Sequence, residues 1–476
     1  MLGKQNRWQE DLFIAGPLSS FIPDDHILKQ VDKVLDLSWL RKEVADLYCS
    51  NNGRPSIDPE AAVRLMLAGF FQGVVHDRKL MREAQVNLAI RWFAGYRLDE
   101  KLPDHSSLTK IRQRWGAARF KKIFLKTVES CIQAGLVNGE TIHVDATLIR
   151  GDVSWESVTT EHAETVITEN ASEEEKPKGR GRPKKQPKAK KRSTTDPDVT
   201  MATSCKKVLA EPCYKQHGAV DDVCGVVVDV EISTGGANEG NQLPDQVKRI
   251  EENTGVKIKT LSCDSGYGHG KNYEHLEQKN IDAIIPPKNL GKRGKGIPLS
   301  KFKYDAKNKI VKCPNNKILT PRTESKLGVT YRSQTKDCRN CRLRGDCFGF
   351  TSTSRTVTIV PGYKYLLRAR RRHKKPDEKF KRTYTRHWWK IEGMHGEAKT
   401  QHGLSRAVRR GLANMAIQAY LTAAVINLKR LAKYTGGIFA DFCGCIANIL
   451  AALTNTIALR LILTNQTRKL IWKMTG

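Results

Sequence analysis

The residues best placed to do chemistry are three carboxylates that lie far apart in the chain: Asp145, Asp264 and Glu392. Mg²⁺ and Mn²⁺ are hard ions that prefer oxygen ligands and usually keep several waters. Three carboxylates can hold two such ions about 3.5–4 Å apart, an arrangement that supports in-line phosphoryl transfer. Whether these acids can act together depends on the elements that carry them.

Asp145 lies in the stretch Thr141–Arg150, where apolar residues alternate with His143, Asp145 and Thr147. Alternation with a period of two predicts a strand with one face in a core. The other face, which carries Asp145, is predicted to point outward. A surface aspartate on a strand is the plainer interpretation, so a functional role depends on partners.

Asp264 follows a predicted strand over 256–263 and precedes the small-residue loop 265–268. Loops at the carboxyl ends of strands in open α/β sheets commonly expose functional groups. The alternative is that Asp264 only caps the next turn. The surrounding stretches predict a hairpin over 216–233, helices over 244–253 and 273–279, and a strand over 283–285.

Glu392 and Glu397 lie in Trp388–Gly403, which is predicted to be a long helix. At about 100° per residue, one face of this helix carries Glu392 together with basic side chains. Glu397 lies well round the helix, so Glu392 is the candidate and Glu397 the backup. The alternative is a solvated helix with salt bridges. The basic residues predicted to share the Glu392 face are His395, Lys399, His402 and Arg406.

The whole chain is strongly basic, with 82 Lys and Arg against 50 Asp and Glu and a formal charge of +32 over 476 residues. Ten of the basic residues lie in Lys176–Arg192, so the rest of the chain is basic as well. Such a charge favours a polyanionic partner, with nucleic acid ahead of membrane. A basic protein without such a partner is the alternative.

Residues 24–135 have apolar residues at helical spacing. Asp104 or Ser106 is placed to cap a helix that carries Lys110, Arg112 and Arg114. A basic helix in a small helical unit commonly docks into a DNA major groove. These three residues are therefore DNA-binding candidates, although a merely solvated helix is the alternative.

Lys176–Arg192 has almost no apolar residue and is predicted to be disordered. Within it, Arg180 and Arg182 flank a glycine and precede a proline. A flat segment of this kind can lay two arginines along a narrow minor groove, as the AT-hook of chromatin proteins does. A generic basic linker is the alternative. A second basic cluster, Arg368–Lys375, is predicted to contact phosphates.

The cysteines indicate a reducing compartment, because twelve of them occur in a chain whose first residues contain no apolar signal-peptide core. One group of four has a Cys-x-x-Cys pair and is compatible with a structural zinc site, with unliganded thiols as the alternative. These residues are Cys313, Cys338, Cys341 and Cys347. Phe439–Leu463 is fairly apolar but is interrupted by polar residues, which favours a packed or partner-binding helix over a membrane anchor.

The segments HVDATLI, CDSGYG and IEGMHGEAKTQHGL, which contain Asp145, Asp264 and Glu392, resemble the DDE transposases of bacterial insertion sequences. The resemblance is to the insertion-sequence family 1182 type and covers roughly residues 10–435. It implies an α/β RNase H-like catalytic domain, a mixed sheet flanked by helices. It also implies an all-α N-terminal DNA-binding domain and a cysteine-bearing insertion.

The resemblance further implies that the three acids are the catalytic residues and the ligands of two Mg²⁺ (or Mn²⁺) ions. The family's third-acid helix often has Tyr and Arg before the glutamate and Lys after it. Glu392 and Lys399 fit the second half of that pattern, whereas Thr385 and Trp388 occupy the Tyr and Arg positions. Lys399 is therefore expected to contact a DNA phosphate near the cut.

A DNA transposase is thus the predicted function: it would bind the element's terminal inverted repeats, cut a strand and join the freed 3′-OH to target DNA. By resemblance it would act as a homo-oligomer on paired ends, in the bacterial cytoplasm and associated with the nucleoid, without a membrane partner. One alternative is an Mg²⁺-dependent endonuclease without strand transfer. Another is a catalytically inactive DNA-binding protein derived from a transposase.

The predicted domains follow from these boundaries. They are a helical DNA-binding domain at 1–137, the first part of the catalytic domain at 138–288 with a disordered basic insertion at 155–212, a cysteine-bearing insertion at 289–375, the last part of the catalytic domain at 376–435, and an apolar helical tail at 436–476.

Overall fold

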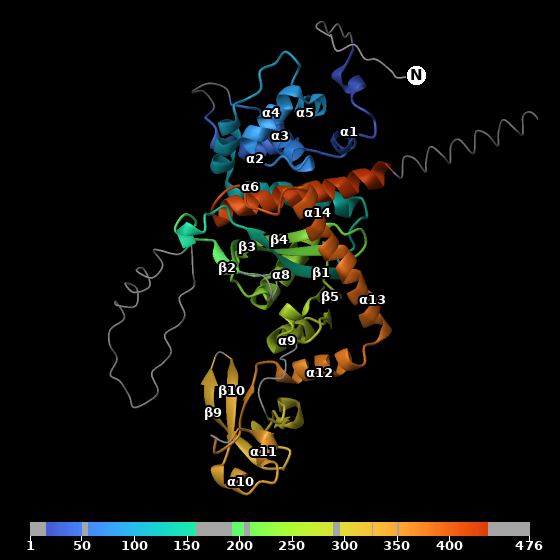
Figure 1. The fold of residues 1–476 in the computed structure, drawn as a ribbon. Coiled ribbons are helices and arrows are strands. Elements are labelled where there is room, and N and C mark those ends of the chain that lie inside the picture. Colours follow the sequence, from blue (N-terminus) through green and yellow to red (C-terminus); the bar gives the residue numbers. More distant parts are fainter. Residues whose placement is uncertain are drawn as a thin grey trace, which may run out of the picture. The chain divides into compact units, whose positions relative to one another are not determined.

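The computed structural model describes residues 16–49, 56–158, 193–203, 210–288, 296–325, 327–349 and 352–436 (Figure 1). The chain divides into two compact units. The helical unit comprises residues 1–136, 400–403 and 420–476, and the sheet unit comprises residues 137–399 and 404–419. No helix among the described residues is long and apolar enough to cross a membrane.

The helical unit begins its helices with side-chain caps that the sequence provides. Asp58 accepts hydrogen bonds from the backbone N–H groups of Glu60 and Ala61, and Asp104 accepts one from Ser106, which confirms Asp104 as the cap. The long helix α6 is kinked where Gly116 adopts a φ of 69°. The helices are α1 (Ile27–Asp32), α2 (Leu40–Val44), α3 (Pro59–Phe71), α4 (Asp77–Val86), α5 (Leu88–Phe93) and α6 (His105–Gln133).

A further helix covers residues 412–436, and its residues from 420 onward belong to the helical unit. Tyr420 stacks on Phe124 of α6 with ring centroids 6.2 Å apart, and Asn427 donates a hydrogen bond to the hydroxyl of Thr127. The end of the predicted last part of the catalytic domain, 376–435, thus forms a helix that packs on α6 from residue 420 onward. The predicted tail at 436–476 lies outside the described residues beyond 436.

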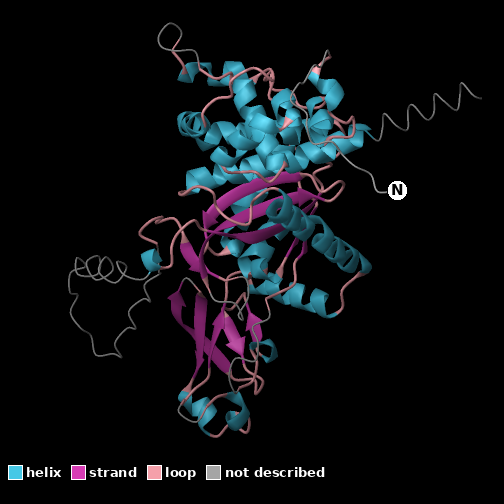
Figure 2. Ribbon diagram, turned by 45° about the horizontal axis from the view of Figure 1, so that its top comes forward, coloured by secondary structure: helices cyan, strands magenta, loops and turns pink. Residues whose placement is uncertain are grey.

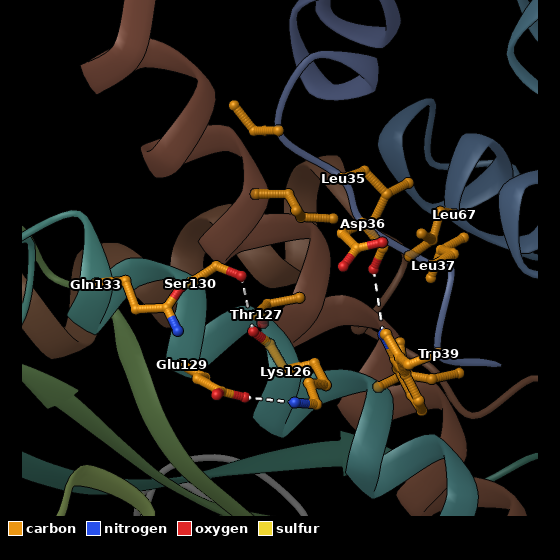
Figure 3. Close-up of a pocket in the computed structure, with 13 residues that line it drawn as sticks. Leu35, Asp36, Leu37, Trp39, Leu67, Lys126, Thr127, Glu129, Ser130 and Gln133 are labelled. Atoms are coloured by element: carbon orange, nitrogen blue, oxygen red, sulfur yellow. Dashed lines mark hydrogen bonds and ion pairs between the residues drawn. The ribbon is translucent and has the colours of Figure 1, made fainter. Parts of the chain in front are cut away.

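The helical unit contains a pocket of about 190 Å³, shown in Figure 3. Asp36 and Trp39 lie on one side of it, where the Asp36 carbonyl accepts a hydrogen bond from the Trp39 indole N–H at 3.2 Å. Lys126 and Glu129 of α6 form an ion pair of 2.7 Å on the other side. The pocket contains none of the three candidate acids.

The sheet unit is built on a six-stranded mixed sheet, in which β3 pairs with β4, β1 and β2, followed by β5 and β6 beyond β1. The β1–β5 and β5–β6 pairs are parallel, and the β1–β3 and β3–β4 pairs are antiparallel. The strands are β1 (Thr141–Arg150), β2 (Thr200–Ala202), β3 (Glu211–Asp221), β4 (Val227–Thr234), β5 (Thr260–Cys263) and β6 (Asp282–Ile284).

Helices pack on this sheet, as Figure 2 shows. Helix α8 (Glu239–Thr254) contacts β4 and ends at Gly255, whose φ of 69° suits the left-handed cap position. Helix α9 (Gly270–Gln278) contacts β6. Helix α13 (Glu378–His387) continues through a π-helical turn (Trp388–Glu392) into α14 (Gly393–Gln401), and the π-helical turn contacts β1 and β3.

A second sheet of five strands follows the order β11-β10-β9-β8-β7 and forms a separate group of strands in Figure 2. Helices α10 (Thr335–Arg339) and α11 (Arg344–Cys347) follow β10, and α12 (Tyr363–Lys374) follows β11. The strands are β7 (Lys303–Asp305), β8 (Ile310–Lys312), β9 (Ile318–Ser325), β10 (Gly328–Ser333) and β11 (Thr356–Ile359).

The predicted fold class is confirmed in its coarse form: a mixed sheet flanked by helices and a helical N-terminal region are present. The predicted disordered insertion, 155–212, is wrong at its ends. A short 3-10 turn covers Glu156–Val158, β2 pairs with β3, and β3 begins at Glu211. Sheet pairing orders these ends, whereas Arg180 and Arg182 lie outside the described residues.

Candidate active site

The sheet places Asp145 beside Asp264. Val144 of β1 is the register partner of Cys263 in the parallel β1–β5 pair, so the next residues along the two strands are neighbours. The Asp264 carboxylate accepts a hydrogen bond from the backbone N–H of Gly266 at 2.9 Å. Asp264 therefore caps the following turn, and its side chain is held in a fixed position.

Glu392 is the last residue of the π-helical turn, and its side chain is exposed. Ile391 and Met394, on either side of it in the sequence, are buried. Single π-helical turns inside α-helices occur frequently at functional sites. The helix is thus anchored by apolar side chains on either side of the exposed Glu392.

The electrostatics of Asp145 show that the acids are neighbours. The pKa of Asp145 is raised to about 7, chiefly by burial and also by the negative charges of Asp264, Glu239 and Glu392, while a hydrogen bond from the Ala146 backbone N–H opposes the shift. Burial likewise raises the pKa of Asp264, and the charge of Glu239 adds to that effect. The three predicted acids are therefore brought together, and a fourth, Glu239, joins them.

Glu239 was not predicted from the sequence. It begins α8, and its Oε1 lies 2.8 Å from the ammonium group of Lys215. A Cβ built on Gly266 would lie 2.8 Å from the Glu239 Oε2 and 2.9 Å from the Asp264 Oδ1. A larger residue at this position would have to displace one of these two carboxylates. The signal in the sequence is an acidic residue in the first turn of a helix directly after a hairpin, in a stretch whose glycines predict a loop.

The face of β1 that carries Asp145 is covered, which corrects the prediction of an outward face. His143 is fully buried, and its ring lies 5.7 Å from that of His387 at the end of α13. Gly218 of β3 is the register partner of Asp145, and a Cβ there would lie 3.1 Å from the Met394 Cε. The glycine opposite Asp145 thus gives the Glu392 helix room to pack on the sheet.

Two of the residues predicted to share the Glu392 face lie near Asp145. The His395 Nε2 is 3.9 Å from the Asp145 Oδ2, but burial lowers the pKa of His395 to about 3, so the imidazole is neutral. Burial lowers the pKa of Lys399, while the Asp145 charge opposes that shift. Lys399 is therefore a cation near this carboxylate, and its contact with a DNA phosphate stays a prediction.

The other two residues predicted for that face, His402 and Arg406, do not lie on the helix, because α14 ends at Gln401. His402 belongs to the helical unit, where its Nδ1 lies 2.8 Å from the Phe70 carbonyl oxygen. Arg406 donates a hydrogen bond to Asp152 at 2.8 Å. The backup acid, Glu397, is half-buried on α14.

The acidic residues around Asp145 suit a hard divalent ion, because the charged groups that repel its carboxylate are themselves carboxylates. A cation would relieve the repulsion that raises the pKa of Asp145. Among the residues that the structure describes, no group of three or more His, Cys, Asp or Glu is already arranged as a metal site. Binding of a divalent ion would therefore require the carboxylate side chains to move toward a common point.

The predicted DNA-binding helix is corrected at one residue. Arg112 is 2% exposed and makes two hydrogen bonds of 2.7 Å to the Asp77 carboxylate, so it is a structural residue. Lys110 and Arg114 are exposed on the same helix. Helical periodicity cannot distinguish these positions, because burial of Arg112 depends on α4 supplying Asp77.

Two family models match the chain. Residues 17–114 match the model described as "Transposase domain (DUF772)", and residues 312–432 match the model described as "Transposase DDE domain". The matched residues 312–432, which include Glu392 and Lys399, are thus similar to a transposase DDE domain. No curated protein matches the sequence.

Solved structures with similar chains include a piggyBac transposase synaptic complex with hairpin DNA, at 10% identity and a TM-score of 0.35. That alignment covers 87% of this chain and 75% of the other. A Mos1 transposase paired-end complex with the left transposon end aligns at 9% identity with a TM-score of 0.16, covering 52% of this chain and 65% of the other. A Mos1 mariner paired-end complex with Mn aligns at 11% identity with a TM-score of 0.16, covering 52% of this chain and 64% of the other.

Proposed function

We propose that this protein is a DNA transposase of an insertion sequence, of the insertion-sequence family 1182 type. The observation that carries the proposal is the convergence of Asp145, Asp264 and Glu392, whose charges interact although they come from β1, the end of β5 and the third-acid helix. The match of residues 312–432 to a transposase DDE domain supports it. The sheet unit would be an RNase H-like catalytic domain.

In this proposal Asp145, Asp264 and Glu392 are the catalytic residues and hold two Mg²⁺ or Mn²⁺ ions. When bound, such ions activate the attacking oxygen and stabilise the leaving oxygen of an in-line displacement. Lys399 contacts a DNA phosphate near the cut. The Lys215–Glu239 ion pair fixes the fourth carboxylate beside Asp264. His395, neutral and buried, keeps water away from one side of Asp145.

The DNA-binding part of the proposal concerns the terminal inverted repeats and the target. Lys110 and Arg114 on α6 are exposed cations that can contact DNA, and the AT-hook-like Arg180 and Arg182 would add a minor-groove contact. The net charge of +32 supports a polyanionic partner. The protein would act as a homo-oligomer on paired ends in the bacterial cytoplasm, associated with the nucleoid.

The test uses DNA that carries the element's ends, either intact or pre-cut, with target plasmid and Mg²⁺. Wild type is expected to cut intact ends and to join pre-cut ends to the plasmid. Asp145→Ala, Asp264→Ala and Glu392→Ala should each abolish both reactions and keep DNA binding in a gel-shift assay. Glu397→Ala is the matched control on the same helix and should retain activity.

The alternatives give different results in the same assay. Cutting without joining of pre-cut ends would indicate an endonuclease. Salt-sensitive binding without cutting by wild type, unchanged by Asp145→Ala, would indicate an inactive DNA-binding protein. Loss of activity in Glu397→Ala with activity kept in Glu392→Ala would overturn the assignment of the third acid.

A further inference from the structure

Four cysteines of the second sheet's region meet around one small cavity. Cys313 follows β8, Cys338 lies in α10, Cys341 lies between α10 and α11, and Cys347 ends α11. All four line a cavity of about 20 Å³. A cavity needs about 10–15 Å³ to hold one water molecule, so this one has room for a single small ion.

The backbone around these cysteines folds into tight turns that aim the sulfur atoms. In the Cys313 turn the Cys313 N–H donates to the Lys317 carbonyl at 2.9 Å, and the Asn316 N–H donates to the Cys313 carbonyl at 2.8 Å. Asn316 takes a positive φ of 56° to close this turn. In the second turn the Cys341 N–H donates to the Cys338 carbonyl at 3.4 Å.

Three of the sulfur atoms already receive hydrogen bonds or lie within their reach. The Lys317 backbone N–H donates to the Cys313 Sγ at 3.3 Å, and the Asn315 side-chain amide donates to the Cys341 Sγ at 3.6 Å. The Ser333 hydroxyl lies 3.0 Å from the Cys338 Sγ. These contacts hold the three sulfur atoms in defined positions beside the cavity.

The region around the cavity has a small apolar core. Its buried apolar side chains are few, and they are Phe302, Val311, Leu319, Tyr331, Val357 and Ile359. Small units with thin cores are commonly stabilised by disulfides or by a structural metal. The four cysteines are free thiols in the structure.

We propose that Cys313, Cys338, Cys341 and Cys347 form a structural site for one Zn²⁺ ion that holds the α10–α11 turns against the β8–β9 turn. Four thiolates in tetrahedral arrangement are a preferred zinc set, with Zn–S distances of about 2.3 Å. Among the described residues the four thiols are not yet at ligand spacing. Binding therefore draws the sulfur atoms into the cavity and locks the turns.

The test measures metal in the full-length protein, purified with a thiol reductant and without chelator. Elemental analysis should find about one zinc ion per chain in wild type. Cys338→Ser/Cys341→Ser should lose it. Cys49→Ser/Cys224→Ser, which changes two exposed cysteines outside the cavity, is the matched control and should keep it.

Two measurements on the wild-type protein decide the question even if the double variant does not fold. Apoprotein titrated with Co²⁺ should develop the thiolate-to-cobalt charge-transfer band and the visible bands of tetrahedral cobalt, and Zn²⁺ should abolish both. Bound zinc should also protect these four cysteines from alkylation, as read by peptide mass spectrometry. Iron in place of zinc, a disulfide within the group, or four reduced thiols that bind neither ion would overturn the proposal.

Discussion

Asp145 is the residue on which the site's charge balance depends. In the folded chain its pKa is raised to about 7 from an ordinary value of 3.8, first because it is buried and then because three other carboxylates lie nearby. An ionised Asp145 is thus costly in the folded protein without a cation. A bound divalent ion would reverse that cost, so metal binding and the stability of the sheet unit should be linked.

Asp145→Asn tests this linkage. From pH 3.8 to about 7 the folded chain binds more protons at Asp145 than the unfolded chain does, so wild-type stability falls as the pH rises. In EDTA at about pH 8, the variant should be more stable than wild type by about 1–4 kcal/mol. Below pH 3.8 the two proteins should converge.

Thermal denaturation at several pH values measures this difference, and Mg²⁺ should stabilise wild type more than the variant. If Asp145→Asn were less stable than wild type at alkaline pH in the absence of metal, ionised Asp145 would not be costly in the folded protein.

Glu239→Gln tests the acid that the sequence did not reveal. Its charge lies beside Asp264 and raises that residue's pKa, and outer ligands of a metal site typically change metal affinity by about 10–100-fold. We expect the Mg²⁺ concentration for half-maximal cleavage to rise about tenfold. Glu252→Gln, an exposed change on the same helix, is the control. An unchanged Mg²⁺ requirement would show that Glu239 only anchors Lys215.

At the scale of elements, the third-acid helix must lie close to the sheet for Glu392 to reach the other acids. Gly218, opposite Asp145, permits that approach, because a Cβ there would contact Met394 and His395. The π-helical turn immediately before α14 sets which residue of the helix faces the site. Helix position therefore controls assembly of the site.

Gly218→Val should push α14 away from β3 and reduce cleavage about 10–100-fold, because small displacements of catalytic groups are costly. DNA binding should persist, since the change lies in the sheet. Gly393→Ala, at the first residue of α14, is the control, because an added Cβ there meets nothing within 4 Å. Equal activity in both variants would show that the helix position is not limiting.

The α4–α6 pair depends on the buried ion pair between Asp77 and Arg112. Arg112→Met removes the guanidinium partner of the buried Asp77 carboxylate, and loss of one partner of a buried ion pair typically destabilises a protein by about 3–5 kcal/mol. Lys110→Ala, at an exposed position, should change stability by less than about 0.5 kcal/mol. Chemical denaturation followed by tryptophan fluorescence compares them, and a mild effect of Arg112→Met would contradict the structural role.

At the scale of the whole molecule, the excess of positive charge makes DNA affinity depend on salt. The double change Lys110→Ala/Arg114→Ala should lower the slope of log affinity against log salt by about 2, because each cation that neutralises a phosphate contributes about one to that slope. Lys248→Ala, an exposed lysine on α8, should leave the slope unchanged. Equal slopes in both variants would exclude α6 from the DNA interface.

The local features could be predicted from short stretches of the chain. Alternation over Thr141–Arg150 predicted β1, the polar turn predicted the β3–β4 hairpin, and the Asp104 cap began α6 where expected. The three candidate acids could be singled out because each lies in a short stretch whose pattern is readable within about ten residues. The net charge likewise needs no structure.

Which faces are buried and which side chains pair could not be predicted, because both depend on how the elements pack. The tertiary structure buried the Asp145 face of β1 under the third-acid helix, paired Arg112 with Asp77, and brought Glu239 beside Asp264. The two residues of each pair are far apart in the sequence, and local patterns do not show that they meet. Periodicity reports only that a side chain lies on one face of its own element, whereas burial and pairing depend on which other element covers that face.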